Sequence, residues 1–117
     1  MISKTYDENM IKINIKPLSV NDAWKGKKFK TPKYNKYIRD LLLLLPKMEV
    51  PTGKLIARYE FGFSSRGSDW DNPVKPLQDI LQKKYGFNDS LIYEAKVIKK
   101  IVPKGEEYLK FSLEHLK

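Results

Sequence analysis

A run of alternating residue types constrains the fold of this chain most. From Leu55 to Phe63, apolar or aromatic residues at every second position are interleaved with residues such as Ile56, Arg58 and Glu60. Successive side chains of a β-strand point to opposite faces of the sheet. The run therefore predicts a long strand with one face in the core.

The segment that begins at Thr31 predicts an amphipathic helix. Thr31 is a favourable N-cap, and Pro32 can occupy the first helical position because its missing N–H is not needed there. Pro46 then ends the run, since proline cannot continue a helix. The apolar stripe at helical spacing consists of Tyr34, Tyr37, Ile38, Leu41, Leu42 and Leu45. Leu43 and Leu44 lie off this stripe and hint at cover from a second side, such as another subunit.

A second helix is expected to end at Gly86. Its apolar stripe consists of Val74, Leu77, Leu81 and Tyr85. Gly86 suits the left-handed backbone conformation that ends many helices. Pro76 lacks a backbone donor, so the regular helix is expected to start nearer Pro76 than Pro73.

Three more strands complete the expected order of elements. They cover residues 11–15, 91–102 and 109–113. The last two are separated by a Pro-Lys-Gly turn and are expected to form a C-terminal hairpin. Residues 17–30 predict a polar loop with at most a short β excursion. We therefore expect a single α+β domain over residues 1–117, ordered β-α-β-α-β-β, with a mixed sheet and two helices.

Length and composition exclude several classes of protein. A chain of 117 residues suits one domain with one core. Its longest apolar run, Leu41–Leu45, is far shorter than the ~20 residues of a membrane span. The absence of cysteine excludes a disulfide framework and a thiolate zinc site. The N-terminus lacks the apolar region of a secretory signal, so we expect a cytoplasmic protein.

The positive charge of the chain favours an acidic partner. The formal net charge is +9, and one short stretch without acidic residues is rich in lysine. Its lysines are Lys25, Lys27, Lys28, Lys30, Lys33 and Lys36. Nucleic acid is the first partner to consider and an anionic membrane surface the second. A membrane role is disfavoured because the following helix is needed for the core. A solvated lysine face remains the plain alternative.

Acidic residues and a lysine surround the start of the second helix. Asp69 and Asp71 are two positions apart, Lys75 follows them, and Asp89 lies beyond the helix. In an extended segment residues i and i+2 point the same way, so the first two carboxylates can face one ion. Asp89 joins them only if the chain doubles back along the helix, or if the pair lies on an extended loop.

This set of side chains has the chemistry of a Mg²⁺ site acting on a polyanion. Oxygen ligands with open water positions suit Mg²⁺, which can activate water and stabilise a leaving oxyanion. Lys75 could neutralise charge on the scissile phosphate. A metal-dependent nuclease is therefore the first hypothesis. The alternative is structural: Asp71 or Asn72 caps the helix, Asp89 shapes a turn and Asp79 is a solvated helix acid.

Other uses of the same spacing fit less well. An EF-hand loop starting at Asp69 needs glycine and glutamate where the chain has Val74 and Ile80. A nucleotide-sugar transferase needs a larger sheet and a glycine-rich phosphate loop. A serine hydrolase needs a Gly-x-Ser-x-Gly elbow, which is absent. The single histidine, His115, is expected to be an ordinary surface residue.

The same residues resemble a known family. The chain is similar over nearly its whole length to the RusA family of Holliday-junction resolvases, which are small homodimeric Mg²⁺-dependent endonucleases often carried by prophages. The most specific matches are Asp-x-Asp-Asn-x-x-Lys in residues 69–75, a further Asp in the helix, and the segment before the strand at residues 86–92. Residues 17–21 match the family's Pro-x-Ser-x-Asn near the first strand.

By this resemblance, Asp69, Asp71 and Asp89 are the catalytic, metal-binding aspartates, and Lys75 is the catalytic lysine. The implied metal is Mg²⁺, with Mn²⁺ as a possible substitute. DNA contacts are implied for Ser19, Asn21, Lys25, Lys27, Lys28, Lys30, Arg66 and Asn72. Asn88 departs from the family, because it replaces the first acid of the usual Asp-Asp pair. Arg66 stands alone in a loop that is arginine-rich in RusA itself.

The resemblance implies a homodimer that resolves four-way DNA junctions during recombination and repair, in a bacterial or phage-infected cell. It would cut one phosphodiester in each of two opposed strands, and a two-fold dimer matches the symmetry of the junction. Trp24, Trp70 or Phe87 could stack on unpaired bases at the crossover. No membrane and no small-molecule cofactor is expected. The alternatives are a non-catalytic basic DNA-binding module and a nuclease for other branched DNA.

Overall fold

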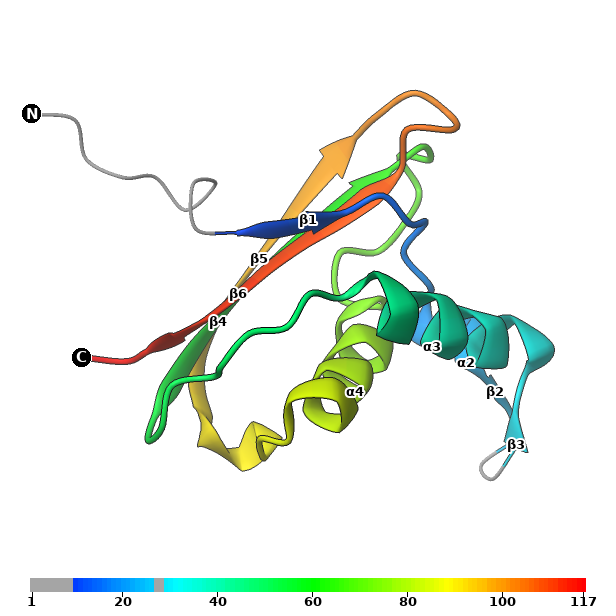
Figure 1. The fold of residues 1–117 in the computed structure, drawn as a ribbon. Coiled ribbons are helices and arrows are strands. Elements are labelled where there is room, and N and C mark those ends of the chain that lie inside the picture. Colours follow the sequence, from blue (N-terminus) through cyan, green and yellow to red (C-terminus); the bar gives the residue numbers. More distant parts are fainter. Residues whose placement is uncertain (1–9, 27–28) are drawn as a thin grey trace, which may run out of the picture.

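The structure is a computed structural model that describes residues 10–26 and 29–117. Its main sheet has the strand order β1-β6-β4-β5, and the helices cover one face of this sheet (Figure 1). The four strands are β1 (Ile11–Ile13), β4 (Leu55–Phe63), β5 (Ile92–Ile101) and β6 (Tyr108–His115). The helices are α2 (Val20–Ala23), α3 (Pro32–Leu44), α4 (Val74–Tyr85) and the 3₁₀ helix η1 (Asp89–Leu91). The expected α+β fold with a mixed sheet is confirmed.

The expected C-terminal hairpin is wrong. Strand β4 pairs in parallel with β5 on one side and antiparallel with β6 on the other, so β5 and β6 are not neighbours. After β5 the chain passes the end of β4, where the Val102 N–H donates to the Phe63 carbonyl at 2.7 Å. A period of two identifies a strand, but it does not identify the strand's partner. In the unit β4-α4-β5, helix α4 connects two parallel strands. The start of α4 therefore follows the end of β4, and the end of α4 leads back to the start of β5.

The long central strand β4 has one buried face and a second face that is buried in part. Its helix-facing residues Leu55, Ala57, Tyr59 and Phe61 are all 0% exposed, as the alternation predicts. On the opposite face Glu60 is 1% exposed and accepts a 2.6 Å hydrogen bond from a tyrosine hydroxyl of β6. Lysine amino groups of β5 and β6 lie 3.5 and 3.6 Å from the same carboxylate. The buried charge is therefore paired, as burial requires.

Helix α3 begins and ends as expected. The Thr31 hydroxyl oxygen accepts a 3.1 Å hydrogen bond from the Tyr34 N–H, and Pro32 is the first helical residue. Tyr34, Tyr37 and Leu41 are buried against the sheet side. Leu43 is 82% exposed, so its face of α3 has no cover in the described chain.

Helix α4 starts earlier than expected. It begins at Val74, with Pro73 at the N-cap position, rather than near Pro76. Pro76 is then the third helical residue, where an N–H has no intrahelical partner, so its missing donor costs nothing. At the other end Gly86 has φ 71° and its N–H donates to the Gln82 carbonyl at 2.8 Å, as expected for a helix stop.

Residues 17–30 hold more structure than a polar loop. Ser19 caps the short helix α2, and its hydroxyl oxygen accepts a 3.1 Å hydrogen bond from the Asn21 N–H. The two-stranded ribbon β2 (Trp24–Lys25) and β3 (Phe29–Lys30) follows, which confirms the short β excursion. Such short elements lack a period long enough to be detected in sequence. Lys27 and Lys28 lie outside the described residues.

Candidate functional site

The loop that joins β4 to α4 carries Asp69, Asp71 and Asn72. Lys99 of β5 anchors the first half of this loop, because its amino group donates to the backbone carbonyls of Arg66, at 2.7 Å, and Ser68. The second half is anchored from the other side of the site. There the Val20 N–H of α2 donates to the Asn72 carbonyl at 2.8 Å.

The two loop aspartates have exposed side chains and different local partners. Asp69 accepts a 3.1 Å hydrogen bond from the Asn72 side-chain amide. Asp71 uses its backbone carbonyl to accept from the Val74 N–H at 3.1 Å. No side chain caps α4, so the structural alternative that Asp71 or Asn72 is its side-chain N-cap is wrong. The Asp71 carboxylate is left available for another role.

Asp89 lies beside α4, at the start of η1. Its Oδ2 atom accepts a 3.3 Å hydrogen bond from Gln78 Nε2 and lies 3.6 Å from Lys75 Nζ. Its backbone N–H donates to Gln82 Oε1 at 2.9 Å. The neighbouring Asn88 caps η1 by accepting from a backbone N–H at 2.9 Å. Asn88 therefore has a structural task that an amide performs without added negative charge.

The amino group of Lys75 interacts with one carboxylate of α4 and with the carboxylate of Asp89 in η1. Its amino group lies 3.0 Å from Asp79 Oδ1, one turn along α4, and 3.6 Å from Asp89 Oδ2. The hydrogen bond to Asp79 and the charges of both carboxylates raise the pKa of Lys75 above its ordinary value. The lysine is therefore held as a cation. Asp79 is half-buried and paired with Lys75, rather than simply solvated.

Three residues that position Asp89 were missed in the sequence. Gln78 and Gln82 contact it directly, and the buried Tyr59 hydroxyl donates to Gln78 Oε1 at 3.0 Å. Burial raises the pKa of Tyr59, which keeps this hydroxyl protonated as a donor. The available signal was the polar stripe at helical spacing formed by Lys75, Gln78, Asp79 and Gln82.

The predicted metal ligands form two groups in this structure. Asp89 belongs with Lys75, whereas Asp69 belongs with Asn72. Within residues 10–26 and 29–117, no three acidic, histidine or cysteine side chains are grouped closely enough to hold a metal ion. The donor chemistry nevertheless fits Mg²⁺, which prefers carboxylate oxygens and retains water ligands. The exposed side chains of Asp69 and Asp71 leave both carboxylates accessible to such an ion.

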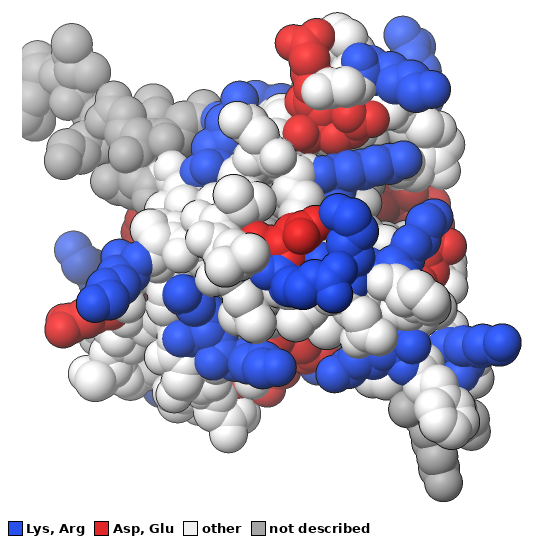
Figure 2. Space-filling model, turned by 45° about the vertical axis from the view of Figure 1, so that its right-hand side comes forward, with Lys and Arg blue, Asp and Glu red and all other residues white. Residues whose placement is uncertain are grey.

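A polar cleft of about 250 Å³ lies beside the loop aspartates. It connects the predicted DNA-contacting segments at Ser19 and Asn72, because both line it together with Asp69. Asn21, Lys25, Lys30 and Arg66 are exposed and lie outside this lining. Basic side chains occupy more of the face seen in Figure 2 than acidic ones, as a polyanion-binding surface requires.

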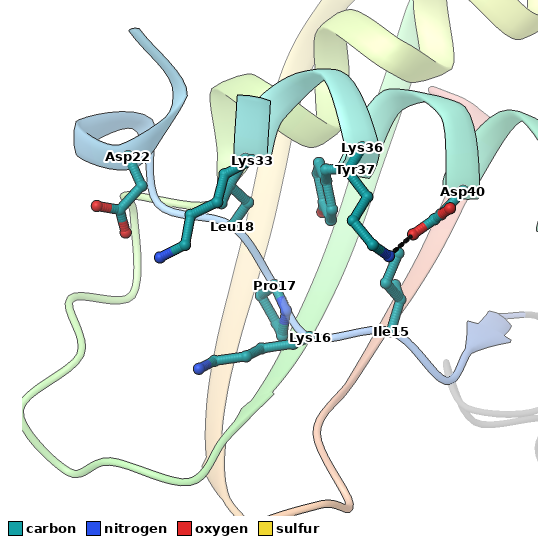
Figure 3. A pocket seen from close by; sticks show the side chains of 9 residues that line it. All are labelled: Ile15, Lys16, Pro17, Leu18, Asp22, Lys33, Lys36, Tyr37 and Asp40. Carbon is teal, nitrogen blue, oxygen red and sulfur yellow. Dashed lines mark hydrogen bonds and ion pairs between the residues drawn. The ribbon is translucent and has the colours of Figure 1, made fainter. Parts of the chain in front are cut away.

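A second cavity, of about 300 Å³, lies between α3 and the chain that leaves β1 (Figure 3). Its apolar part includes Pro17, Leu18 and the buried Tyr37, while three lysines stand around it. These lysines are Lys16, Lys33 and Lys36, of which Lys36 pairs with Asp40 at 2.6 Å. Asp22 also lines the cavity, so two acidic residues partly balance its three lysines.

The remaining singled-out residues divide between surface and core. Trp70 is 56% exposed beside Asp69, and Trp24 is 37% exposed with its ring 5.6 Å from Tyr34. Phe87 packs against the core, which makes it a packing residue. His115 is exposed at the end of β6, as expected for a surface residue. Among the described residues, no helix is long and apolar enough to cross a membrane.

Comparison with family models and with curated proteins gives no match. No model of a protein family matches this chain, and no curated protein matches it. The functional assignment therefore rests on the residues and on the geometry around α4.

Proposed function

We propose that this protein is a Mg²⁺-dependent, structure-selective endodeoxyribonuclease that resolves four-way DNA junctions, as a member of the RusA family. The observation that carries the proposal is the 3.6 Å pairing of Asp89 with Lys75, which lies in the first turn of α4, the helix that the loop with Asp69 and Asp71 leads into. This combination of carboxylates and a cation is the one that phosphodiester hydrolysis needs.

Each residue has a role in the proposed reaction. Asp69, Asp71 and Asp89 would hold Mg²⁺, which supplies an activated water and stabilises the leaving oxygen when it is bound. Lys75 places a fixed positive charge near the scissile phosphate. Gln78 keeps the Asp89 carboxylate in place through its hydrogen bond to Oδ2. The strand is cut when water attacks phosphorus and the bond to the leaving sugar oxygen breaks.

The basic surface supports DNA as the substrate. A net charge of +9 favours salt-sensitive binding that depends little on sequence. The α2 segment is fixed to Asn72 by a backbone hydrogen bond, so DNA bound along it would lie next to the loop aspartates. In the proposed homodimer, two such sites would meet the two-fold symmetry of a junction.

The separation of Asp89 from Asp69 favours one second candidate, a DNA-binding module without catalysis. Synthetic DNA decides between the two functions. We expect purified protein to nick a four-way junction with Mg²⁺ or Mn²⁺, and to cut a linear duplex of the same sequence much more slowly. Binding of the junction without cleavage in either metal would refute the nuclease and favour the non-catalytic DNA-binding module. Equal cleavage of linear, three-way and four-way DNA would remove the resolvase assignment.

Replacing Gln78 by Leu tests the support of Asp89. The substitution keeps a helix-forming side chain but removes the hydrogen bonds to Asp89 and Tyr59. Because partners of metal ligands typically contribute about 10–100-fold to metal affinity or activity, we expect the Mg²⁺ concentration for half-maximal cleavage to rise by about 10-fold. Cleavage titrated with Mg²⁺ measures this shift, and Tyr59→Phe should give a smaller one. An unchanged titration in Gln78→Leu would contradict the positioning role.

A further inference from the structure

Strand β5 is a long edge strand. Within the described residues it is hydrogen-bonded to one neighbour, β4, and it spans ten residues, whereas β1 at the other edge spans three. Unpaired N–H and C=O groups along such an edge are a template for pairing with another chain.

The exposed side chains of β5 are complementary to those of a second β5 strand running antiparallel to it. Large apolar surface is exposed near both ends, with Tyr93 61% and Ile101 45% exposed. Glu94 is the one acidic residue of the strand, and it lies near the end opposite to Lys99 and Lys100. A strand running antiparallel would bring the acidic end of one copy beside the basic end of the other.

We propose that a second copy of this chain pairs antiparallel along the β5 edge, about a two-fold axis that passes through Val97. In antiparallel strands, side chains directly opposite each other lie on the same face of the sheet. Because side chains alternate between the two faces, a two-fold axis normal to the sheet pairs only residues whose numbers have an even sum. Centring the axis on Val97 places Glu94 opposite Lys100, and the regular opposition ends there because Tyr93 lies at a register irregularity of β5.

Charge disfavours the neighbouring registers. A shift by one step in one direction places Lys96 opposite its own copy, and a shift in the other direction places Lys96 opposite Lys100. Like charges directly opposite each other destabilise a strand pair. The regular part of β5 begins at Glu94. Within it, a register that pairs Glu94 with Lys96 covers only residues 94–96 of each copy, whereas the Val97 register covers residues 94–100. The Val97 register therefore combines the longer contact with a Glu94–Lys100 pair, which Lys100 can form beside its contact with Glu60 because its side chain is 51% exposed.

This pairing would also place the two candidate sites of the dimer on the same side of the joined sheet. An axis normal to the sheet keeps the helix-covered faces of both copies on one side. Lys99, which anchors the loop before Asp69, would lie two residues from the axis, or roughly 7 Å along the strand. This consequence rests on the proposed nuclease, because it places both acidic loops against the same DNA.

A cysteine scan tests the register directly, since the chain contains no cysteine. The single variants are Ala95→Cys, Lys96→Cys, Val97→Cys and Ile98→Cys. Under mild oxidation at micromolar protein, Val97→Cys is expected to give a mostly covalent dimer, because directly opposite Cα atoms lie about 4.5–5.5 Å apart, within disulfide reach. Lys96→Cys and Ile98→Cys should each give little, since their copies lie on ~7–8 Å diagonals, but should cross-link when mixed.

A charge reversal provides the reversible counterpart. Glu94→Lys is expected to raise the dimer dissociation constant about 10-fold or more, measured by light scattering during size exclusion, because two attractive pairs become repulsive. Glu106→Lys makes the same charge change on the exposed turn between β5 and β6 and should leave the dimer intact. Thermal unfolding of both variants checks that they are folded.

Several outcomes would overturn the interface. They are a wild-type protein that stays monomeric at micromolar concentration, a flat cross-linking profile, and a maximum at position 95, 96 or 98. Cleavage is scored separately on reduced wild-type protein. A monomer that cuts junctions would refute this interface but leave the proposed nuclease activity standing. A Val97 cross-link in a protein that does not cut junctions would support the interface and refute the nuclease activity.

Discussion

Replacing Asp71 by Asn is expected to abolish junction cleavage while leaving junction binding intact. The substitution removes one anionic oxygen ligand, and removing a ligand should cost more than the ~10–100-fold typical for partners that only support ligands. We therefore expect cleavage to fall by at least about 100-fold. Fold and DNA surface should persist, because the Asp71 side chain is exposed and its helix contact is made by the backbone carbonyl.

Single-turnover cleavage and gel-shift titration on one junction measure the two properties side by side. Asp40→Asn serves as the matched control, since it makes the same chemical change on α3, where Asp40 pairs with Lys36. Wild-type cleavage by Asp71→Asn would remove Asp71 from the metal site. A parallel loss of binding would instead assign this residue to the DNA surface.

Replacing Phe61 by Ala is expected to lower the free energy of unfolding by about 3–5 kcal/mol. Phe61 is 0% exposed on the helix-facing side of β4, and its ring lies 6.2 Å from the rings of both Tyr59 and Phe63. Truncation removes buried apolar surface and leaves a cavity between strand and helices. Since a domain has only about 5–15 kcal/mol of stability, the variant should be close to unfolding at 37 °C.

Urea unfolding followed by circular dichroism measures the loss. Phe29→Ala is the matched control, because Phe29 on β3 is 71% exposed and should change the free energy of unfolding by no more than about 0.5 kcal/mol. A loss below about 1 kcal/mol in Phe61→Ala would mean that the core closes around the gap, contrary to the packing described for β4.

Local signals in the sequence predict the elements well. Thr31 and Pro32 mark the start of α3, Gly86 marks the end of α4, and the alternation from Leu55 to Phe63 identifies β4. These features depend on backbone chemistry within a few residues. The partners of β5 and β6 could not be predicted, because pairing depends on which apolar faces meet across distant parts of the chain.

The candidate site was likewise predictable only in part from the sequence. Its charged residues are recognisable by type and spacing, and the crossover β4-α4-β5 explains why Asp89 lies near Lys75. The contacts of Gln78 and Tyr59 with this group depend on how α4 packs on β4, which no short pattern specifies. Asp71 and Asp89 remain predicted ligands of one ion, on separate elements of the fold.

The place of β6 in the sheet also governs how this chain can fold. Strand β1 pairs with β6, so its partner residues, such as Ile11 and Phe111, are separated by nearly the whole described chain. Contacts of such sequence separation are slow to form because a long loop must close first. A nascent chain on the ribosome can assemble the β4-α4-β5 unit early, but one edge of β4 stays open until β6 has been synthesised. Chaperone binding to that edge during translation is the consequence we expect.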